Sequence, residues 1–367
     1  MIIFAMYALK VRGDSGASGG HISNTQLIMD TAAICGCAVL APGLSPRAVD
    51  LFRQGGVEVI TSEFPQTGLR ARFQKRRWLS RHLHWALCRG GVAAVFSTNG
   101  VTDIAAAAIR KSKASASHVI ITRAFEDLYY SKYVGNTFAR LKCLTLDALA
   151  LGAVARSYRS ADLIVTNSLF MRAVVSNYFG LHSSMVEVLY PPLSASFSDF
   201  VEPGQEITIG IINPSPRKGE AVMIGLADAN PNIVFKYFGP VDRNFHRSNV
   251  LYCGWKADVS GIFCEIDILI VPSLWHEPLG RAAIEAIAHG RIALVSDRGG
   301  LPETVDPFFV VADDTCGTWN SAIRRVLDDK NSSREAWQRS AARLDRFLEK
   351  SHGAAIKSVI ERITNGS

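Results

Sequence analysis

The chain has 367 residues, of which 48% are hydrophobic and 20% charged, and its formal net charge is +7. This length exceeds one ordinary hydrophobic core and favours two domains. Low-complexity tracts are absent, and no repeat period is obvious along the chain. The seven cysteines are scattered and never spaced as C-x-x-C, which favours reduced thiols in a cytosolic protein over metal or disulfide roles.

The charge is unevenly distributed along the sequence. Residues 1–193 hold 21 Lys and Arg against 11 Asp and Glu, whereas the remainder holds 19 against 22. A basic first half and a slightly acidic second half predict different partners for the two halves. An anionic membrane surface or an anionic acceptor would suit the first half.

Short runs rich in Val and Ile alternate with helical stretches from the start of the chain. The apolar run at 1–9 is too short to span a bilayer and is expected to be a buried strand rather than a signal peptide. Buried strands separated by helices predict a parallel sheet with helices on both faces. Further strands of this sheet are expected at 37–42, 57–61, 92–98, 118–122 and 161–168.

The same pattern restarts in the second half. The strands expected there are 207–214, 233–240, 250–254, 266–273, 291–297 and 308–312. The Pro/Ser/Gly-rich stretch from 191 to 204 is the best linker candidate. We therefore predict an α/β fold of two Rossmann-like domains, 1–193 and 194–345, which face each other across a cleft. A closing helix over 346–367 could pack back on the N-terminal domain or cap the other one.

Ligands of open parallel sheets bind beyond the carboxyl ends of the strands, and three loops have that placement. The first follows the first strand and precedes a helix, and its glycines would let a backbone pass close to a ligand. These glycines are Gly13, Gly16, Gly19 and Gly20. A simple flexible loop is the alternative interpretation.

The second loop, 211–220, places Arg217 and Lys218 just before a helix. Cations beside a helix N-terminus after a strand favour a phosphate group. A solvent-facing basic pair would give the same sequence.

The third loop follows the strand at 266–273 and precedes a helix that is expected to contain Pro278 in its first turn. Glu277 would then lie at the mouth of the helix and could accept hydrogen bonds from sugar hydroxyls. The amides of Leu279 and Gly280 are expected to point outward, where an oxyanion can approach.

A second carboxylate, Glu285, lies eight residues after Glu277. Eight residues turn an ideal helix by roughly 80° beyond two full turns, so Glu285 is expected deeper and to one side. Small apolar neighbours surround it, and an unpaired buried carboxylate is costly. Its partner is either a ligand hydroxyl or Arg281, one turn earlier.

The segments PSLWHEPLGRAAIEAIAHG and DRGGLPE resemble the E-x7-E signature of family-4 retaining glycosyltransferases, which have the GT-B fold. PRKG is similar to the phosphate-binding Lys-Gly of that family. RSADLIVTNSLFMRAVVSNYFG with VEVLYPPLS resembles the end of its first domain, and the Gly-rich loop also fits. The similar segments span most of the chain in the right order.

The resemblance implies a nucleotide-diphosphate sugar on the second domain and a glycan or lipid-linked acceptor mainly on the first. Lys218 would pair with the diphosphate, Glu277 with hydroxyls of the donor sugar and Glu285 with the ribose. The amides of Leu279 and Gly280 would bind near the sugar and phosphate. Retention of the anomeric configuration is implied, without metal or any cofactor besides the donor, and no D-x-D motif occurs.

The chain departs from the family pattern in two places. Family members usually carry an arginine before the Lys-Gly, where this chain has Ile212 or Asn213, and Arg217 is a substitute from a different position. Many members also carry a His-Asp pair where this chain reads IITRAFEDLYY. An ordinary polar or salt-bridged loop is one interpretation of the residues there. The candidates for the acceptor side are His21, Arg123 and Glu126.

Residues 69–91 predict a basic helix with an apolar stripe of Leu79, Leu83, Ala86 and Leu87. The cations lie mostly off the stripe, and Trp78 and Trp85 lie beside it. The cations are Arg70, Arg72, Lys75, Arg76, Arg77 and Arg81. Such a helix could rest on an anionic leaflet. A domain helix with a solvated basic face is the alternative, and nucleic acid fits less well because no reading motif accompanies the charge.

We therefore expect a metal-independent retaining glycosyltransferase of surface polysaccharide or glycolipid synthesis. Its expected location is the cytoplasm or the inner face of the plasma membrane, as a peripheral protein. One alternative is a catalytically silent glycosyltransferase-like binding subunit, which the two departures favour. A nucleotide-sugar epimerase or a phosphorylase on the same fold is the other, although no second phosphate site is recognisable.

Overall fold

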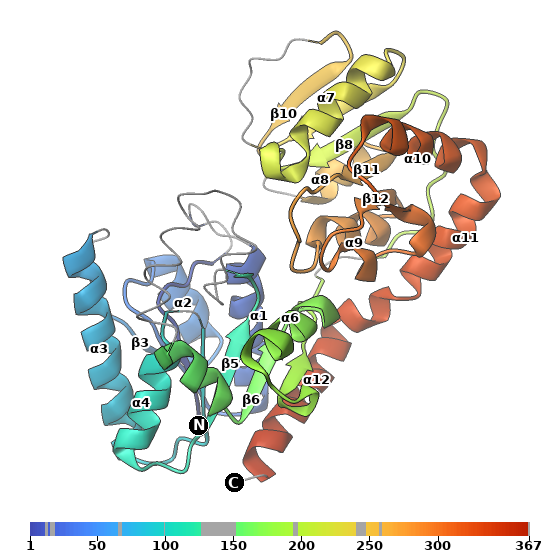
Figure 1. Ribbon diagram of the computed structural model, residues 1–367. Helices are drawn as coiled ribbons and strands as arrows, with labels where there is room; N and C mark the ends of the chain where they lie inside the picture. The colour runs from blue at the N-terminus through green and yellow to red at the C-terminus, as the bar shows by residue number, and fades with distance from the viewer. Residues whose placement is uncertain are drawn as a thin grey trace. The chain divides into compact units, whose positions relative to one another are not determined.

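The computed structural model describes residues 1–11, 14, 19–64, 68–98, 100–125, 152–193, 197–239, 247–256 and 259–365. The chain divides into two compact units (Figure 1). Unit 1 comprises Met1–Pro192 and Glu349–Ser367, and unit 2 comprises Leu193–Leu348. Each unit is built on a parallel sheet with helices, which confirms the predicted fold class.

Unit 1 has a seven-stranded sheet in the order β3-β2-β1-β4-β5-β6-β7, in which all neighbours are parallel. Its strands are β1 Ile2–Ala5, β2 Cys37–Leu40, β3 Glu58–Ile60, β4 Ala94–Ser97, β5 Ser117–Thr122, β6 Leu163–Thr166 and β7 Val186–Val188. Six of them fall in the expected runs. The edge strand β7 was not predicted, because it lies only two residues before the Pro/Ser/Gly-rich stretch expected to be a linker.

Alternating side chains of the strands form two cores, one on each face of this sheet. Phe4 and Val39 pack under α1 (Gly19–Ile34), α2 (Pro46–Gln54) and α12 (Glu349–Asn365). On the opposite face, Ile3 and Leu40 pack under α3 and α4. The bounds of three further helices of this unit are α3 Leu69–Cys88, α4 Thr102–Ser112 and α6 Leu169–Phe179.

The closing helix α12 therefore packs on unit 1. Ile356, Val359 and Ile363 belong to the same core cluster as Phe4. His352 Nδ1 lies 2.7 Å from Asp30 Oδ2 on α1, which adds a polar contact to the apolar one. The last helix is thus part of the first core.

Unit 2 has a six-stranded parallel sheet in the order β10-β9-β8-β11-β12-β13. Its strands are β8 Thr208–Ile212, β9 Val234–Phe238, β10 Val250–Gly254, β11 Ile268–Val271, β12 Ile292–Ser296 and β13 Val310–Val311. Each falls in an expected run. The helices are α7 Glu220–Ala229, α8 Val259–Cys264, α9 Arg281–Ala288, α10 Cys316–Asp328 and α11 Lys330–Ala341.

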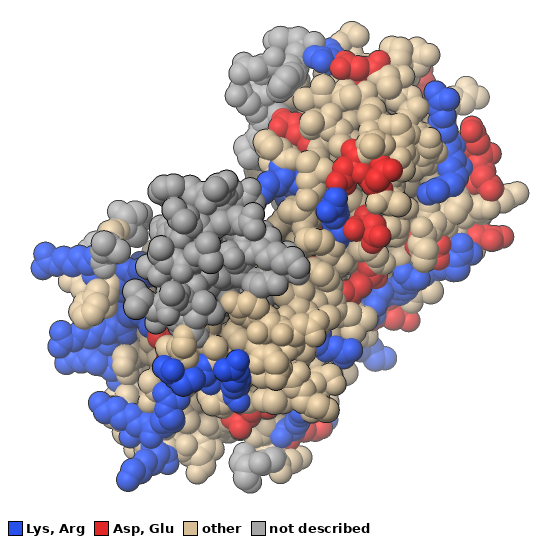
Figure 2. Space-filling model, viewed as in Figure 1, with Lys and Arg blue, Asp and Glu red and all other residues tan. Residues whose placement is uncertain are grey.

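Basic side chains are concentrated on unit 1. Figure 2 shows Lys and Arg gathered over the edge formed by α3 and the end of α4, whereas both signs of charge are mixed over unit 2. In the described part of the chain, no helix is both long enough and apolar enough to cross a membrane.

Candidate functional site

Three loops meet at the carboxyl edge of the unit 2 sheet. Strands β8, β11 and β12 are neighbours in that order, so the loops that follow them are brought together. These loops are residues 213–219, 272–280 and 297–300, and they contain the segments singled out in the sequence. Strand order alone therefore assembles the candidate site.

The first two loops pack backbone against backbone. The amide of Leu274 donates to the carbonyl of Arg217 at 2.8 Å. Gly219 has φ +74°, and a Cβ at this position would lie 1.9 Å from the carbonyl oxygen of Pro272. Only glycine allows both the left-handed backbone and this approach.

The third loop packs on the backbone of Glu277. The amide of Gly300 donates to the Glu277 carbonyl at 2.7 Å, and Gly299 pairs with Glu277 in an isolated parallel bridge. A Cβ at Gly299, where φ is +67°, would lie 2.2 Å from the Glu277 oxygen. The glycine pair of DRGGLPE thus fixes the backbone position of Glu277.

The carboxylate of Glu277 is held from three sides. Trp275 Nε1 donates to Oε1 at 2.9 Å, Ser273 Oγ lies at 3.4 Å, and Lys218 Nζ lies at 3.5 Å. The residue is 9% exposed, so its charge needs these partners. Oε2 has no hydrogen-bond partner among the described residues and remains available for a ligand hydroxyl.

Trp275 was not singled out in the sequence, although it contacts both charged loops. Its indole N–H binds Glu277, and the Arg217 guanidinium lies over its ring, 5.2 Å from the centroid. Such a cation–π contact is favourable and holds Arg217 beside Lys218. The sequence feature that could have identified it is an indole N–H donor two residues before Glu277.

Helix α9 begins at Arg281, so the prediction that Pro278 lies in its first turn is wrong. Gly280 adopts φ +100° and ψ 57°, which is not a helical conformation. Leu279 is buried and Gly280 half-buried. In the described part of the chain, no acceptor takes the amide hydrogens of Leu279 and Gly280, which leaves them for an anion.

Glu285 has the internal partner that the sequence offered as one alternative. Arg281 Nη2 lies 3.3 Å from Glu285 Oε1, in an i,i+4 pair on α9. The two side chains are 25% and 18% exposed, so part of the carboxylate remains accessible. A ligand hydroxyl can therefore bind Glu285 without breaking the ion pair.

The positions that depart from the family pattern do not supply a cation. Ile212 is the last residue of β8. Asn213 has φ 51°, and its backbone N–H donates to the Phe238 carbonyl at 2.6 Å. Gly239 packs on Asn213, since a Cβ there would lie 2.4 Å from Asn213 Oδ1. The cations of this loop are therefore Arg217 and Lys218.

The candidates of unit 1 lie at the carboxyl edge of its own sheet. Gly19 and Gly20 form the exposed first turn of α1, and burial together with nearby Lys10 lowers the pKa of His21. Arg123, which follows β5, is buried and donates from Nε to Asn24 Oδ1 at 2.8 Å. Gly13, Gly16 and Glu126 lie outside the described residues.

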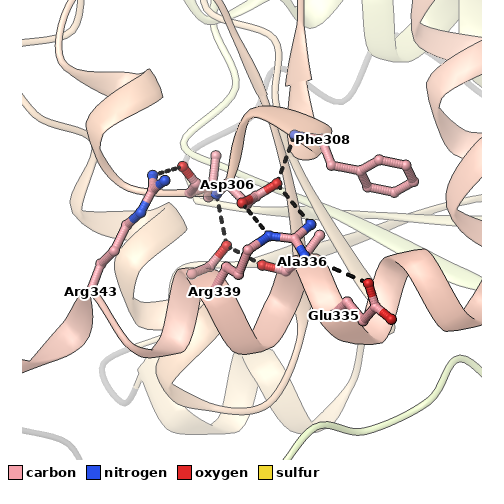
Figure 3. Close-up of polar contacts among 8 residues, drawn as sticks. Asp306, Phe308, Glu335, Ala336, Arg339 and Arg343 are labelled. Atoms are coloured by element: carbon pink, nitrogen blue, oxygen red, sulfur yellow. Dashed lines mark hydrogen bonds and ion pairs between the residues drawn. The ribbon is translucent and has the colours of Figure 1, made fainter.

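Asp306, which follows the short helix Leu301–Glu303, is held against α11 (Figure 3). Asp306 accepts from Arg339 Nε at 2.8 Å and from the Phe308 amide at 3.0 Å. Its own amide donates to Ser340 Oγ at 2.8 Å. The hydrogen bond from Arg339 is the main cause that lowers the pKa of Asp306, and burial opposes it.

In the residues that the structure describes, no three His, Cys, Asp or Glu side chains are grouped so that they could hold a metal ion.

Gly219→Ala should lower the free energy of unfolding of unit 2 by more than about 2 kcal/mol, because the new Cβ forces the first two loops apart. Gly254→Ala is the matched control, since Gly254 has φ +67° but nothing within 4 Å of an added Cβ. It should cost only about 1 kcal/mol. Urea unfolding compares the two, and equal losses would show that the Pro272 contact is unimportant.

Asp306→Ala should lower the free energy of unfolding by about 1–2 kcal/mol at pH 7, because it removes the Arg339 and Phe308 hydrogen bonds. The folded-state pKa of Asp306 is lowered, so this stability is present above the unfolded pKa of about 4 and is lost as pH falls through the folded value. Urea unfolding at pH 7 and below pH 4 should show the difference shrinking. Exposed Asp345→Ala should leave stability unchanged.

The sequence matches a known family over part of unit 2: residues 221–329 match the family described as Glycosyl transferases group 1. A probable transglycosylase of Burkholderia thailandensis is 28% identical over 196 residues, which are 47% of this chain and 52% of that protein. The UDP-Gal:alpha-D-GlcNAc-diphosphoundecaprenol alpha-1,3-galactosyltransferase of Escherichia coli is 29% identical over 115 residues, 30% of this chain and 29% of that enzyme. The matched segments span between 21% and 52% of the lengths of the curated relatives.

A solved structure extends the likeness to nearly the whole chain. HepE of Anabaena in complex with UDP superposes with a TM-score of 0.72 at 16% identity, and the match covers 98% of this chain and 99% of that one. At this identity the likeness shows the fold. Residues 221–329 are therefore similar to a Glycosyl transferases group 1 domain, in a chain with the GT-B fold.

Proposed function

We propose that the chain is a metal-independent retaining glycosyltransferase that moves a sugar from a nucleotide-diphosphate sugar to a glycan or lipid-linked acceptor. The convergence of Lys218, the partly open carboxylate of Glu277 and two amides without a protein acceptor on one sheet edge carries this proposal. A sugar diphosphate has groups that pair with each of these. Its phosphates bind the cation and the amides, and its sugar hydroxyls donate to the carboxylate. Retention rests on the resemblance to the E-x7-E glycosyltransferases.

In this proposal the diphosphate leaves with the electron pair of its bond to the anomeric carbon. The acceptor hydroxyl bonds to that carbon and passes its proton to the leaving diphosphate, which balances the step. Lys218 and the amides of Leu279 and Gly280 stabilise the negative charge that develops on the leaving group, and they need no reorganisation to do so. Arg217, held over Trp275, adds a second cation.

Glu277 and Glu285 have separate roles in donor binding. Oε2 of Glu277 accepts from hydroxyls of the donor sugar, while Oε1 stays with Trp275. Glu285 accepts from the ribose hydroxyls, and its ion pair with Arg281 orients it. Lys218 Nζ must move away from Glu277 to reach the diphosphate. The 3.5 Å distance between Nζ and Oε1 marks a weak contact, so little free energy is lost when it breaks.

Unit 1 is assigned to the acceptor. His21 and Arg123 lie at the carboxyl edge of its sheet, and burial together with nearby Lys10 lowers the pKa of His21 and so favours its neutral form. The names of two relatives favour a surface glycan as product. One is encoded in a cps region of Klebsiella pneumoniae, and the E. coli relative acts on a diphosphoundecaprenol-linked sugar.

Nucleotide binding tests the donor site. We expect one of UDP, GDP, ADP, CMP or dTDP to raise the melting temperature with EDTA present, and UDP is the first choice because HepE binds it. Lys218→Ala and Glu285→Ala should each weaken binding roughly 10- to 100-fold. Lys330→Ala, which removes a cation paired with Glu202, should leave binding unchanged.

The outcomes separate the alternatives. If no nucleotide stabilises the protein, or if Lys218→Ala binds as the unsubstituted protein does, the donor site is refuted and a silent binding subunit is favoured. Conversion of a nucleotide sugar without acceptor would instead identify an epimerase.

Trp275→Phe should lower kcat about tenfold with little change in nucleotide affinity, because it removes the hydrogen bond that orients Glu277 and keeps an aromatic ring under Arg217. Steady-state kinetics and nucleotide titration measure the two effects separately. An equal loss in nucleotide affinity would contradict an orienting role.

A further inference from the structure

Helix α3 presents a large surface that the proposed chemistry of unit 2 does not use. The predicted apolar stripe is confirmed: it packs on the sheet of unit 1 and leaves the opposite side of the helix to solvent. Its buried residues are Leu79, Leu83, Ala86 and Leu87. Two large aromatic side chains are nonetheless exposed on this helix, Phe73 at 68% and Trp85 at 55%.

Arg70, Arg77 and Arg81 share the outward side of α3 and are all exposed. An α-helix turns by about 100° per residue, so the three arginines fall in a sector about 40° wide around the helix axis. Phe73 and Trp85 flank this sector, about 120° apart around the axis and about 18 Å apart along it. Arginines are therefore bordered by an aromatic ring on each side.

The charge of this surface is not compensated locally. Residues 69–113 hold ten Lys and Arg against one Asp, an excess larger than the net charge of the whole chain. That aspartate, Asp103, is already paired with Arg76 at 2.5 Å. Within the described ranges no carboxylate lies in ion-pair distance of the three outward arginines. Figure 2 shows the resulting basic edge.

We propose that the outward face of α3 docks on an anionic lipid leaflet. The three arginines would lie against the headgroups, and Phe73 and Trp85 would enter the boundary between headgroups and acyl chains. Charge complementarity favours an anionic partner. The exposed aromatic rings favour one with an apolar layer beneath its charges, which a lipid leaflet has. This docking does not depend on glycosyl transfer by unit 2.

Flotation of the full chain with vesicles tests the proposal. We expect binding to phosphatidylcholine vesicles that contain phosphatidylglycerol, loss of binding as salt rises, and none to phosphatidylcholine alone. The triple variant R70Q/R77Q/R81Q should bind on the order of 100-fold more weakly, since each cation near an anionic leaflet contributes about fivefold.

The matched control removes the same charge from other helices of unit 1. Arg47 and Arg53 on α2 and Lys357 on α12 are exposed, so R47Q/R53Q/K357Q should fold and bind vesicles almost as the unsubstituted protein does. Equal losses in the two triple variants would show that only net charge matters and would overturn docking through α3.

Fluorescence quenching tests separately whether Trp85 inserts into the leaflet. Vesicles with brominated acyl chains should quench tryptophan fluorescence, and Trp85→Phe should remove most of that quenching. Unchanged quenching in the variant would overturn the insertion, and equal binding to neutral vesicles would overturn the electrostatic part. If single-stranded RNA binds more tightly than anionic vesicles through the same arginines, the partner is nucleic acid and the lipid proposal is wrong.

Discussion

Close packing between backbones is the constraint on which the candidate site depends. Gly219 lies against Pro272, and Gly299 lies against Glu277, so three loops from neighbouring strands act as one rigid block. A side chain at either glycine would separate the loops and with them Lys218 from Glu277. Preorganised charge stabilises a leaving group only when its donors keep their positions, and these contacts supply that rigidity.

The strands were predictable because buried parallel strands appear in the sequence as continuous apolar runs. Strand β7 was not, since its sequence lies directly before the proline-rich stretch that marks the linker. The helix start at Arg281 was missed for a related reason. Proline commonly opens a helix, but the left-handed backbone of Gly280 delays the first turn until after it.

Local pairs in the site were easier to predict than contacts between loops. The Arg281–Glu285 pair follows from an i,i+4 spacing and was foreseen as an alternative. The contacts of Trp275 with Glu277 and Arg217 depend on two loops far apart in the sequence, and no spacing rule reveals them. In α3 the periodicity predicted the buried stripe, whereas the exposure of Phe73 and Trp85 depends on what packs around the helix.

The place of α12 in the core of unit 1 has a consequence for the order of folding during synthesis. Unit 2 is continuous from Leu193 to Leu348, so the ribosome delivers all of it before α12 emerges. The core around Phe4 lacks Ile356, Val359 and Ile363 until then, and its apolar surface stays partly open while unit 2 can already fold. The first unit to be translated is therefore the last to be completed.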